Sequence, residues 1–94
     1  MEKHLNILEE AAKLVSSERN ARYGHPKVAF AQIAAGWKIV LGIDVTPVQV
    51  GQCLVMMKIC RHIQRPEHTD SLTDIAGYAR TLEMLGEKQE EPQQ

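Results

Sequence analysis

The sequence is poor in cysteine and in aromatic residues. Among its 94 residues there are 2 cysteines, 1 tryptophan and 1 phenylalanine, and the aromatic content is 4%. Cys53 and Cys60 fall seven positions apart on one expected helix, about 10 Å by helical rise, which is too far for an intrachain disulfide. A disulfide scaffold is therefore excluded. We expect both cysteines, together with Met56, Met57 and Met84, to be core residues.

Positive and negative charges are nearly balanced in the chain. It has 11 Lys and Arg against 12 Asp and Glu, a net charge of −1 and a pI of about 6.4. This balance gives no electrostatic reason for binding to the DNA groove or to an acidic membrane surface. There is no apolar run of about 18 residues, and the first ten residues are charged and amphipathic, unlike a signal peptide. We expect a cytoplasmic protein without membrane contact.

Apolar residues recur at three- and four-residue spacing, and no stretch alternates as a strand would. The pattern predicts an all-α fold with helices over 2–17, 26–41, 46–64 and 69–85. Thr46-Pro47-Val48-Gln49 is a strong helix start, Pro26 suits a first helical position, and Gly42 suits a helix end. Thr69 or Ser71 is the expected N-cap of the last helix. We expect residues 1–86 to form a single helical domain and residues 87–94 to be a disordered acidic tail.

The helix over 46–64 is apolar on nearly every side. Three short partner helices cannot cover it fully, so we expect part of it, or of the helix that carries Trp37, to pack on another subunit of a homo-oligomer. The alternative is that the first helix and the Trp37 side chain suffice to cover it within one chain. Gly36, inside its helix, is expected to mark a close helix contact.

Five polar residues on the last two helices form the first candidate site. Lys58 and Arg61 are one turn apart, and Asp70, Asp74 and Tyr78 share a stripe with Thr81, opposite an expected apolar face that includes Ala79. An antiparallel hairpin with a loop of four or five residues brings Arg61 toward Asp74 or Asp70. The two sets form either an interhelical ion pair, or a phosphate site in which the aspartates orient the cations or hold Mg²⁺.

The segment ERNARYGHP is the second candidate, either a solvated loop or part of a ligand site. Its guanidinium groups and aromatic ring around Gly24 suit a phosphorylated ligand with a stackable base. The expected ligand-binding residues are thus Arg19, Arg22, Tyr23, His25, Lys58, Arg61 and Tyr78. No zinc spacing, glycine-rich phosphate loop or nucleophile motif is present.

Four segments, RYGHP, IAAGW, VTPVQVGQCLVMMKICR and HTDSLTDIAGYA, resemble a small phage-encoded domain family of unassigned function. That family is in turn similar to the MazG-like all-α nucleoside triphosphate pyrophosphatases. The resemblance covers roughly residues 18–85 and implies a four-helix MazG-like bundle centred on an antiparallel hairpin of the last two helices. In such enzymes a Glu-x-x-Asp pair and an earlier Glu-x-x-Glu pair bind Mg²⁺ to activate water.

The match to these enzymes is incomplete. Asp74 takes the place of the family's aspartate, Ser71 falls where its glutamate would be, and Asp70 lies one residue further back. The helix over 26–41 has no carboxylate, so half of the metal site is missing. Two aspartates alone hold Mg²⁺ and substrate phosphates poorly.

The prediction is therefore a phage-type protein that binds and sequesters a phosphorylated nucleotide, cyclic signalling nucleotides included, without efficient hydrolysis. Such a protein would act in counter-defence in the cytoplasm of the infected host, with no required cofactor and with Mg²⁺ as an optional one. Two alternatives stay open. One is a Mg²⁺-dependent pyrophosphohydrolase with Asp70 and Asp74 as catalytic residues, and the other is a non-catalytic helical module that binds proteins.

Overall fold

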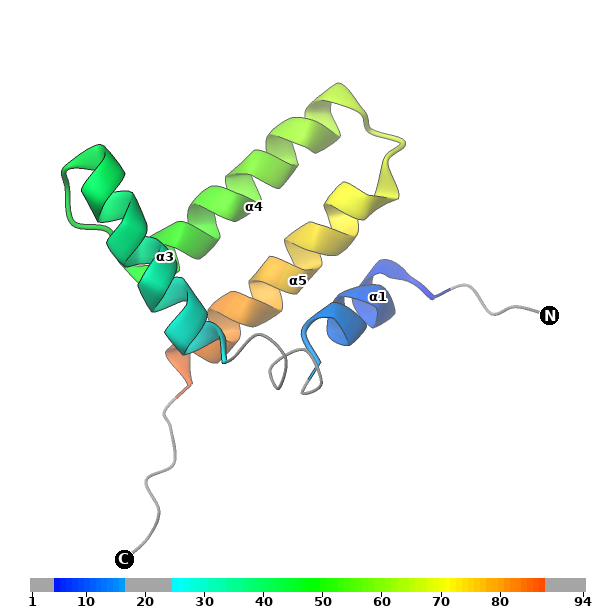
Figure 1. The fold of residues 1–94 in the computed structure, drawn as a ribbon. Helices are drawn as coiled ribbons and strands as arrows, with labels where there is room; N and C mark the ends of the chain where they lie inside the picture. Colours follow the sequence, from blue (N-terminus) through cyan, green and yellow to red (C-terminus); the bar gives the residue numbers. More distant parts are fainter. Residues whose placement is uncertain (1–4, 17–24, 88–94) are drawn as a thin grey trace, which may run out of the picture.

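A computed structural model describes residues 5–16 and 25–87 of the chain. Its regular structure over these residues consists of four α-helices, α1 (Ile7–Leu14), α3 (Pro26–Leu41), α4 (Pro47–Gln64) and α5 (Thr69–Gly86) (Figure 1). The predicted all-α class is confirmed. Residues 88–94, most of the expected tail, lie outside the described residues.

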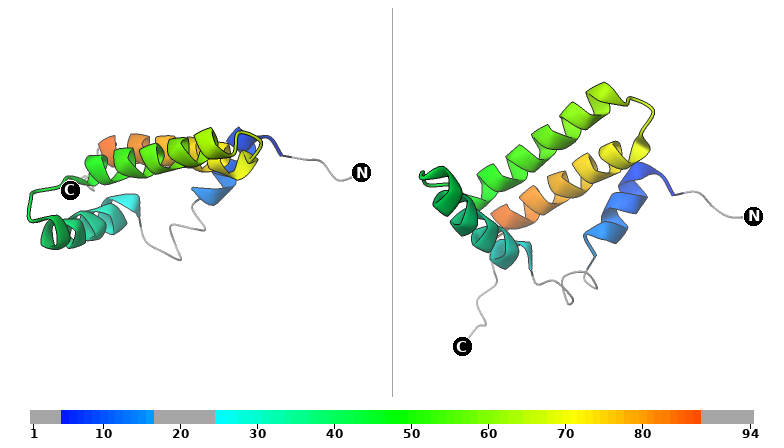
Figure 2. Two further views of the ribbon diagram at one scale, coloured as in Figure 1. Left: turned by 90° about the horizontal axis from the view of Figure 1, so that it is seen from above. Right: turned by 45° about the horizontal axis from the view of Figure 1, so that its top comes forward.

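The fold is arranged around α5. This helix runs antiparallel to α4 after the turn 65–68, and the two make the most extensive helix contact of the described chain. On its other side α5 packs against α1, and near its C-terminal end it meets α3. Seen from above, α4 and α5 form one flat layer with α3 lying to one side of it (Figure 2). The predicted hairpin is therefore present, and the last helix of the chain is the central one.

Local capping fixes most helix starts where the sequence predicted them. Thr46 and Gln49 form a complete capping box at the start of α4, with Pro47 at the first helical position. Pro26 occupies the same position in α3. The α3 helix ends at Gly42, whose φ of 73° is left-handed and favours glycine.

One predicted helix start and one predicted N-cap are wrong. The first helix begins at Ile7, because the side chain of Asn6 accepts a hydrogen bond from the Glu9 amide and Glu9 returns one to Asn6. The N-cap of α5 is His68, which makes no side-chain capping bond, so neither Thr69 nor Ser71 has that role. The turn after Pro66 sets this helix start instead of a side chain.

Only small parts of the helices are buried within the chain. The buried hydrophobic residues of the described chain are Ala11, Ala34, Val50 and Met84. Beside Val50, Gly51 lets α4 approach α5 closely, because a Cβ atom there would lie 2.5 Å from Cδ2 of Leu82. The absence of a side chain at Gly51 thus allows the close contact of the two helices at this point.

Several residues predicted to be core are exposed. Cys53, Cys60, Met56 and Met57 are exposed, because only one side of α4 contacts the rest of the chain. Met84 is buried, as predicted. The apolar outer side of α4 is therefore uncovered by the described residues.

The predicted faces of α5 are also partly wrong. Thr81, expected on a polar stripe, is buried and donates a hydrogen bond from its Oγ1 to the carbonyl oxygen of Gly77, 3.0 Å away. Ala79, expected on the apolar face, is exposed. Neighbours on more than one side cover α5, so one apolar stripe does not describe it.

Candidate functional site

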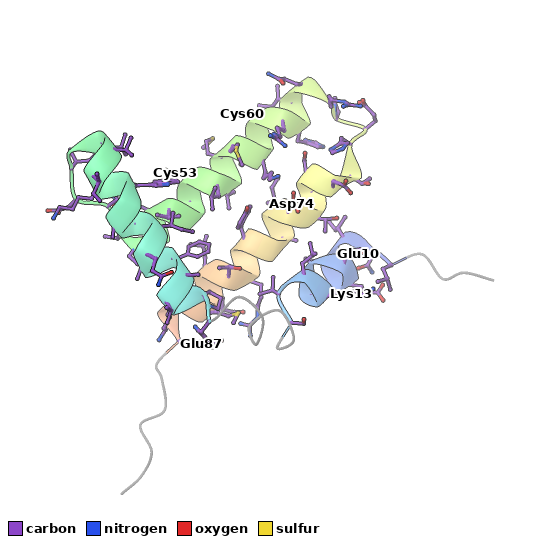
Figure 3. The ribbon with its side chains drawn as sticks, viewed as in Figure 1. Glu10, Lys13, Cys53, Cys60, Asp74 and Glu87 are labelled. Carbon is purple, nitrogen blue, oxygen red and sulfur yellow. The ribbon has the colours of Figure 1, made fainter. Side chains whose placement is uncertain are left out.

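The candidate site contains an ion pair between the two hairpin helices. Nζ of Lys58 on α4 lies 2.8 Å from Oδ2 of Asp74 on α5. The side chains are 14% and 33% exposed, respectively, so the pair is half-buried. Figure 3 labels Asp74 on the first half of α5. The sequence places Lys58 in an apolar helix and leaves its partner open. In the structure that partner is the carboxylate of Asp74.

The register of the hairpin produces this pairing. Pro66 stops α4, and α5 begins at Thr69, so residues near the middle of α4 face residues near the second turn of α5. A turn this short leaves little freedom to slide one helix along the other. The spacing predicts that cations and aspartates meet, with Arg61 toward Asp74 or Asp70, whereas the register places Lys58 beside Asp74.

Arg61 and Asp70 lie one turn nearer the hairpin tip. Arg61 is exposed, and within the described chain its guanidinium has neither a hydrogen bond nor an ion pair. Asp70 is exposed and lies 3.9 Å from Nε2 of His68. The hairpin therefore holds one cation in an ion pair and presents a second to solvent. Tyr78 lies one turn beyond Asp74 and is half-buried.

A groove between α1 and α5 contains both predicted aspartates. It is lined by Leu5, Asn6, Ile7, Glu10, Leu14, Thr69, Asp70, Thr73 and Asp74. Asp74 thus borders this groove and also pairs with Lys58. Glu10, which Figure 3 labels on α1, is a member that sequence reasoning did not assign to the site. Only the packing of α1 on α5 brings it there, and no local pattern signals that packing.

The carboxylates do not gather into a metal centre. Within residues 5–16 and 25–87, no group of three or more His, Cys, Asp or Glu side chains is placed to hold a metal ion. The α3 helix has no acidic residue. The described residues therefore fit Mg²⁺ poorly.

The structure places His25 away from the ion pair. His25 is the N-cap of α3, and its Nδ1 accepts a hydrogen bond from the Lys27 amide, 3.1 Å away. Lys27 in turn donates from Nζ to the carbonyl oxygen of Glu87, just beyond the end of α5. Asp74 lies about 20 Å back along that helix by helical rise. Arg19, Arg22 and Tyr23 lie outside the described residues.

A second charge cluster lies at the far end of α5. Arg80 Nη1 lies 2.7 Å from Glu83 Oε1 and 3.0 Å from Glu87 Oε1. These hydrogen bonds, first that of Glu87 and then that of Glu83, raise the pKa of the Arg80 guanidinium above its ordinary value. Because the cluster is exposed, it is an ordinary surface ion-pair network.

Fold and site together define a small all-α protein with a half-buried lysine–aspartate pair in a helical hairpin. None of the helices in the described ranges is long and apolar enough to cross a membrane. The chain belongs to the family described as "Domain of unknown function (DUF6378)", whose model matches residues 6–86.

Two relatives come from mycobacteriophages. The "Gene 55 protein" of Mycobacterium phage D29 is 40% identical over 83 residues, which are 88% of this chain and 55% of that protein. The "Gene 55 protein" of Mycobacterium phage L5 is 33% identical over 82 residues, 86% of this chain and 53% of that protein. The chain spans about half the length of these relatives. No solved structure matches it.

Proposed function

We propose that the protein binds a phosphorylated nucleotide at the α4–α5 hairpin and sequesters it without efficient hydrolysis. The observation that carries this proposal is the arrangement of two cations one turn apart. Asp74 holds Lys58 at 2.8 Å, while Arg61 presents an unpaired guanidinium within the described chain. A planar guanidinium binds phosphate oxygens through two parallel hydrogen bonds, so Arg61 would be the principal contact.

Asp74 would act as a positioning residue. The carboxylate of Asp74 pairs with the Lys58 ammonium, whose side chain is 14% exposed, and a phosphate arriving at Arg61 adds a second anion to the same neighbourhood. Lys58 would then donate hydrogen bonds both to Asp74 and to the phosphate. Arg19, Arg22 and Tyr23 would complete the site in this proposal, and Tyr78 would line it.

Binding without turnover is the better-supported form of this activity. Activation of water by Mg²⁺ in a MazG-like enzyme needs several carboxylates around the ion. The described residues offer no such group, and α3 lacks acidic residues. The pyrophosphohydrolase alternative would have to use Asp70 and Asp74 with groups beyond the described ranges.

The phage origin of the two relatives supports sequestration as the purpose of binding. A phage protein that holds an intact host nucleotide would work in the cytoplasm of the infected bacterium and remove a signal from host defence. A homo-oligomer would multiply the sites carried by each particle. Cyclic and linear nucleotides share the phosphate chemistry that Arg61 would recognise.

A nucleotide screen tests the proposal. The protein is incubated with cyclic and linear nucleotides with and without Mg²⁺, its melting temperature is measured, and the ligand is analysed after denaturation. A ligand at about 100 times its Kd stabilises the folded state by about 2.7 kcal/mol, which raises the melting temperature by several degrees. Intact recovery supports sequestration, whereas Mg²⁺-dependent conversion supports the pyrophosphohydrolase.

Arg61→Gln and Arg65→Gln form a matched pair for this screen. Both arginines are exposed near the end of α4, and Arg65 lies 3.7 Å from Glu67. We expect Arg61→Gln to abolish the ligand-induced shift and Arg65→Gln to preserve it. Equal shifts in the two variants would show that the hairpin tip does not bind the ligand.

The protein-binding module is the second candidate, and exposed apolar side chains on α3 and α4 favour it. In that case the Lys58–Asp74 pair is purely structural. No nucleotide would then raise the melting temperature of the protein.

A further inference from the structure

One side of α3 faces solvent although it carries no charged residue. We name it the outer face of α3, and it consists of Val28, Gln32, Ala35, Gly36, Ile39 and Val40. Four of these recur at spacings of four, three and four residues, the pattern of a helix that packs on another helix. Val28, Ile39 and Val40 are 55%, 84% and 82% exposed. The buried residues of α3, Pro26 and Ala34, lie on its other side.

No contact within the described chain requires a glycine at position 36. A Cβ atom at this position would have no heavy atom within 4 Å, so nothing in the described chain requires the glycine for space. Its φ is not positive, since Gly42 is the described glycine with that conformation. An interior helical glycine is less stable than alanine. Its remaining use is to let a second backbone come close, from outside the described chain.

The apolar area that the outer face of α3 exposes is close to the apolar area of a standard interface. Of the fifteen exposed large hydrophobic residues in the described chain, eleven lie between Val28 and Ile63, and none lies on α5. Three of these eleven, Val28, Ile39 and Val40, lie on the outer face of α3 and together expose on the order of 400 Å². A standard interface buries about 800 Å² per partner, of which a little over half, or about 450 Å², is apolar.

We propose that two copies of this chain pair through the outer faces of α3, with Gly36 near the helix crossing. A surface that must be covered whenever the chain is folded needs a partner that is always present, and another copy meets that condition. An uncharged face can complement itself about a twofold axis without like-charge repulsion. The proposal rests on the homo-oligomer of the proposed function and does not depend on its ligand.

Mass measurement without nucleotide tests the pairing. The full chain is examined by light scattering over a dilution series, beside Ile39→Glu and the control Leu8→Glu, which alters a 68% exposed residue of α1. We expect the wild type and Leu8→Glu to associate alike. Ile39→Glu should raise the dissociation constant at least about tenfold, because a carboxylate would be buried at the interface. A monomeric wild type, or an Ile39→Glu variant with wild-type mass, overturns the proposal.

Cross-linking keeps the test decisive if Ile39→Glu does not fold. In a Cys53→Ser, Cys60→Ser background, Gly36→Cys should form a covalent dimer on mild oxidation with copper phenanthroline, since Cα atoms at a close crossing lie within disulfide range. Leu8→Cys in the same background should stay monomeric on a denaturing gel. Failure of Gly36→Cys to cross-link, or equal cross-linking of Leu8→Cys, refutes the assigned surface. Failure of nucleotide binding would leave these results unchanged.

Discussion

A double-mutant cycle on Lys58 and Asp74 measures what the half-buried ion pair contributes to folding. The variants are Lys58→Met, Asp74→Leu and the two together, which replace the charges by apolar groups of similar length. An exposed ion pair contributes about 0–1 kcal/mol, and removal of one partner from a fully buried pair costs about 3–5 kcal/mol. With side chains 14% and 33% exposed, this pair lies between those limits. We expect each single substitution to cost about 2 kcal/mol.

The double variant should be nearly as stable as the wild type, within about 1 kcal/mol, because no unpaired charge remains between α4 and α5. The coupling energy, which is the sum of the two single costs less the cost of the double variant, is then about 3–4 kcal/mol. The exposed pair Lys38–Asp44, also 2.8 Å apart but with side chains 62% and 90% exposed, is the matched control and should couple by less than about 1 kcal/mol.

Urea unfolding followed by circular dichroism gives these energies, at one fixed protein concentration because the proposed pairing of chains would contribute to stability. The reasoning fails if the two single costs simply add in the double variant. Additive costs would mean that Lys58 and Asp74 do not stabilise each other. Lys58 would then be free of Asp74 in solution, as a purely ligand-binding lysine would be.

Two further substitutions test the local structure. Thr46→Ala should lower the free energy of unfolding by about 1 kcal/mol, because the Gln49 amide loses its hydrogen bond to Thr46 Oγ1, whereas Thr69→Ala should change it by less than about 0.5 kcal/mol; equal losses in urea unfolding would contradict the capping assignment. Gly51→Ala should cost about 1–3 kcal/mol because its Cβ would meet the side chain of Leu82, while Gly86→Ala has open space and should be neutral or stabilising; a lower melting temperature in Gly86→Ala alone would count against the packing described.

Helix positions could be predicted because capping chemistry is local. The starts at Pro26 and Pro47 and the end at Gly42 each depend on residues within one turn. Asn6 and Glu9 form a capping box of the same kind, so the start of α1 could also have been predicted from the sequence. Burial was harder to predict, since an apolar pattern does not say which sides of a helix the rest of the chain covers. Cys53 and Met56 lie on the side of α4 that no described helix covers.

The site could be predicted only in part, for the same reason. A short turn links the two helices, so their spacing predicts that the cations of α4 meet the aspartates of α5, but the register that pairs Lys58 with Asp74 is seen only in the structure. Glu10 reaches the groove beside Asp74 through the contact of α1 with α5, two helices about sixty residues apart in sequence. No periodic pattern carries such pairing information.

The central position of α5 has a consequence during synthesis. Because α1 and α4 make their most extensive contacts with α5, those contacts cannot form until residues 69–86 have left the ribosome. Until then α3 and α4 can pack only on each other, and the side of α1 that contacts α5 stays uncovered. We therefore expect nascent chains truncated before Thr69 to be retained by chaperones and degraded, and α1 to dock only once α5 has emerged.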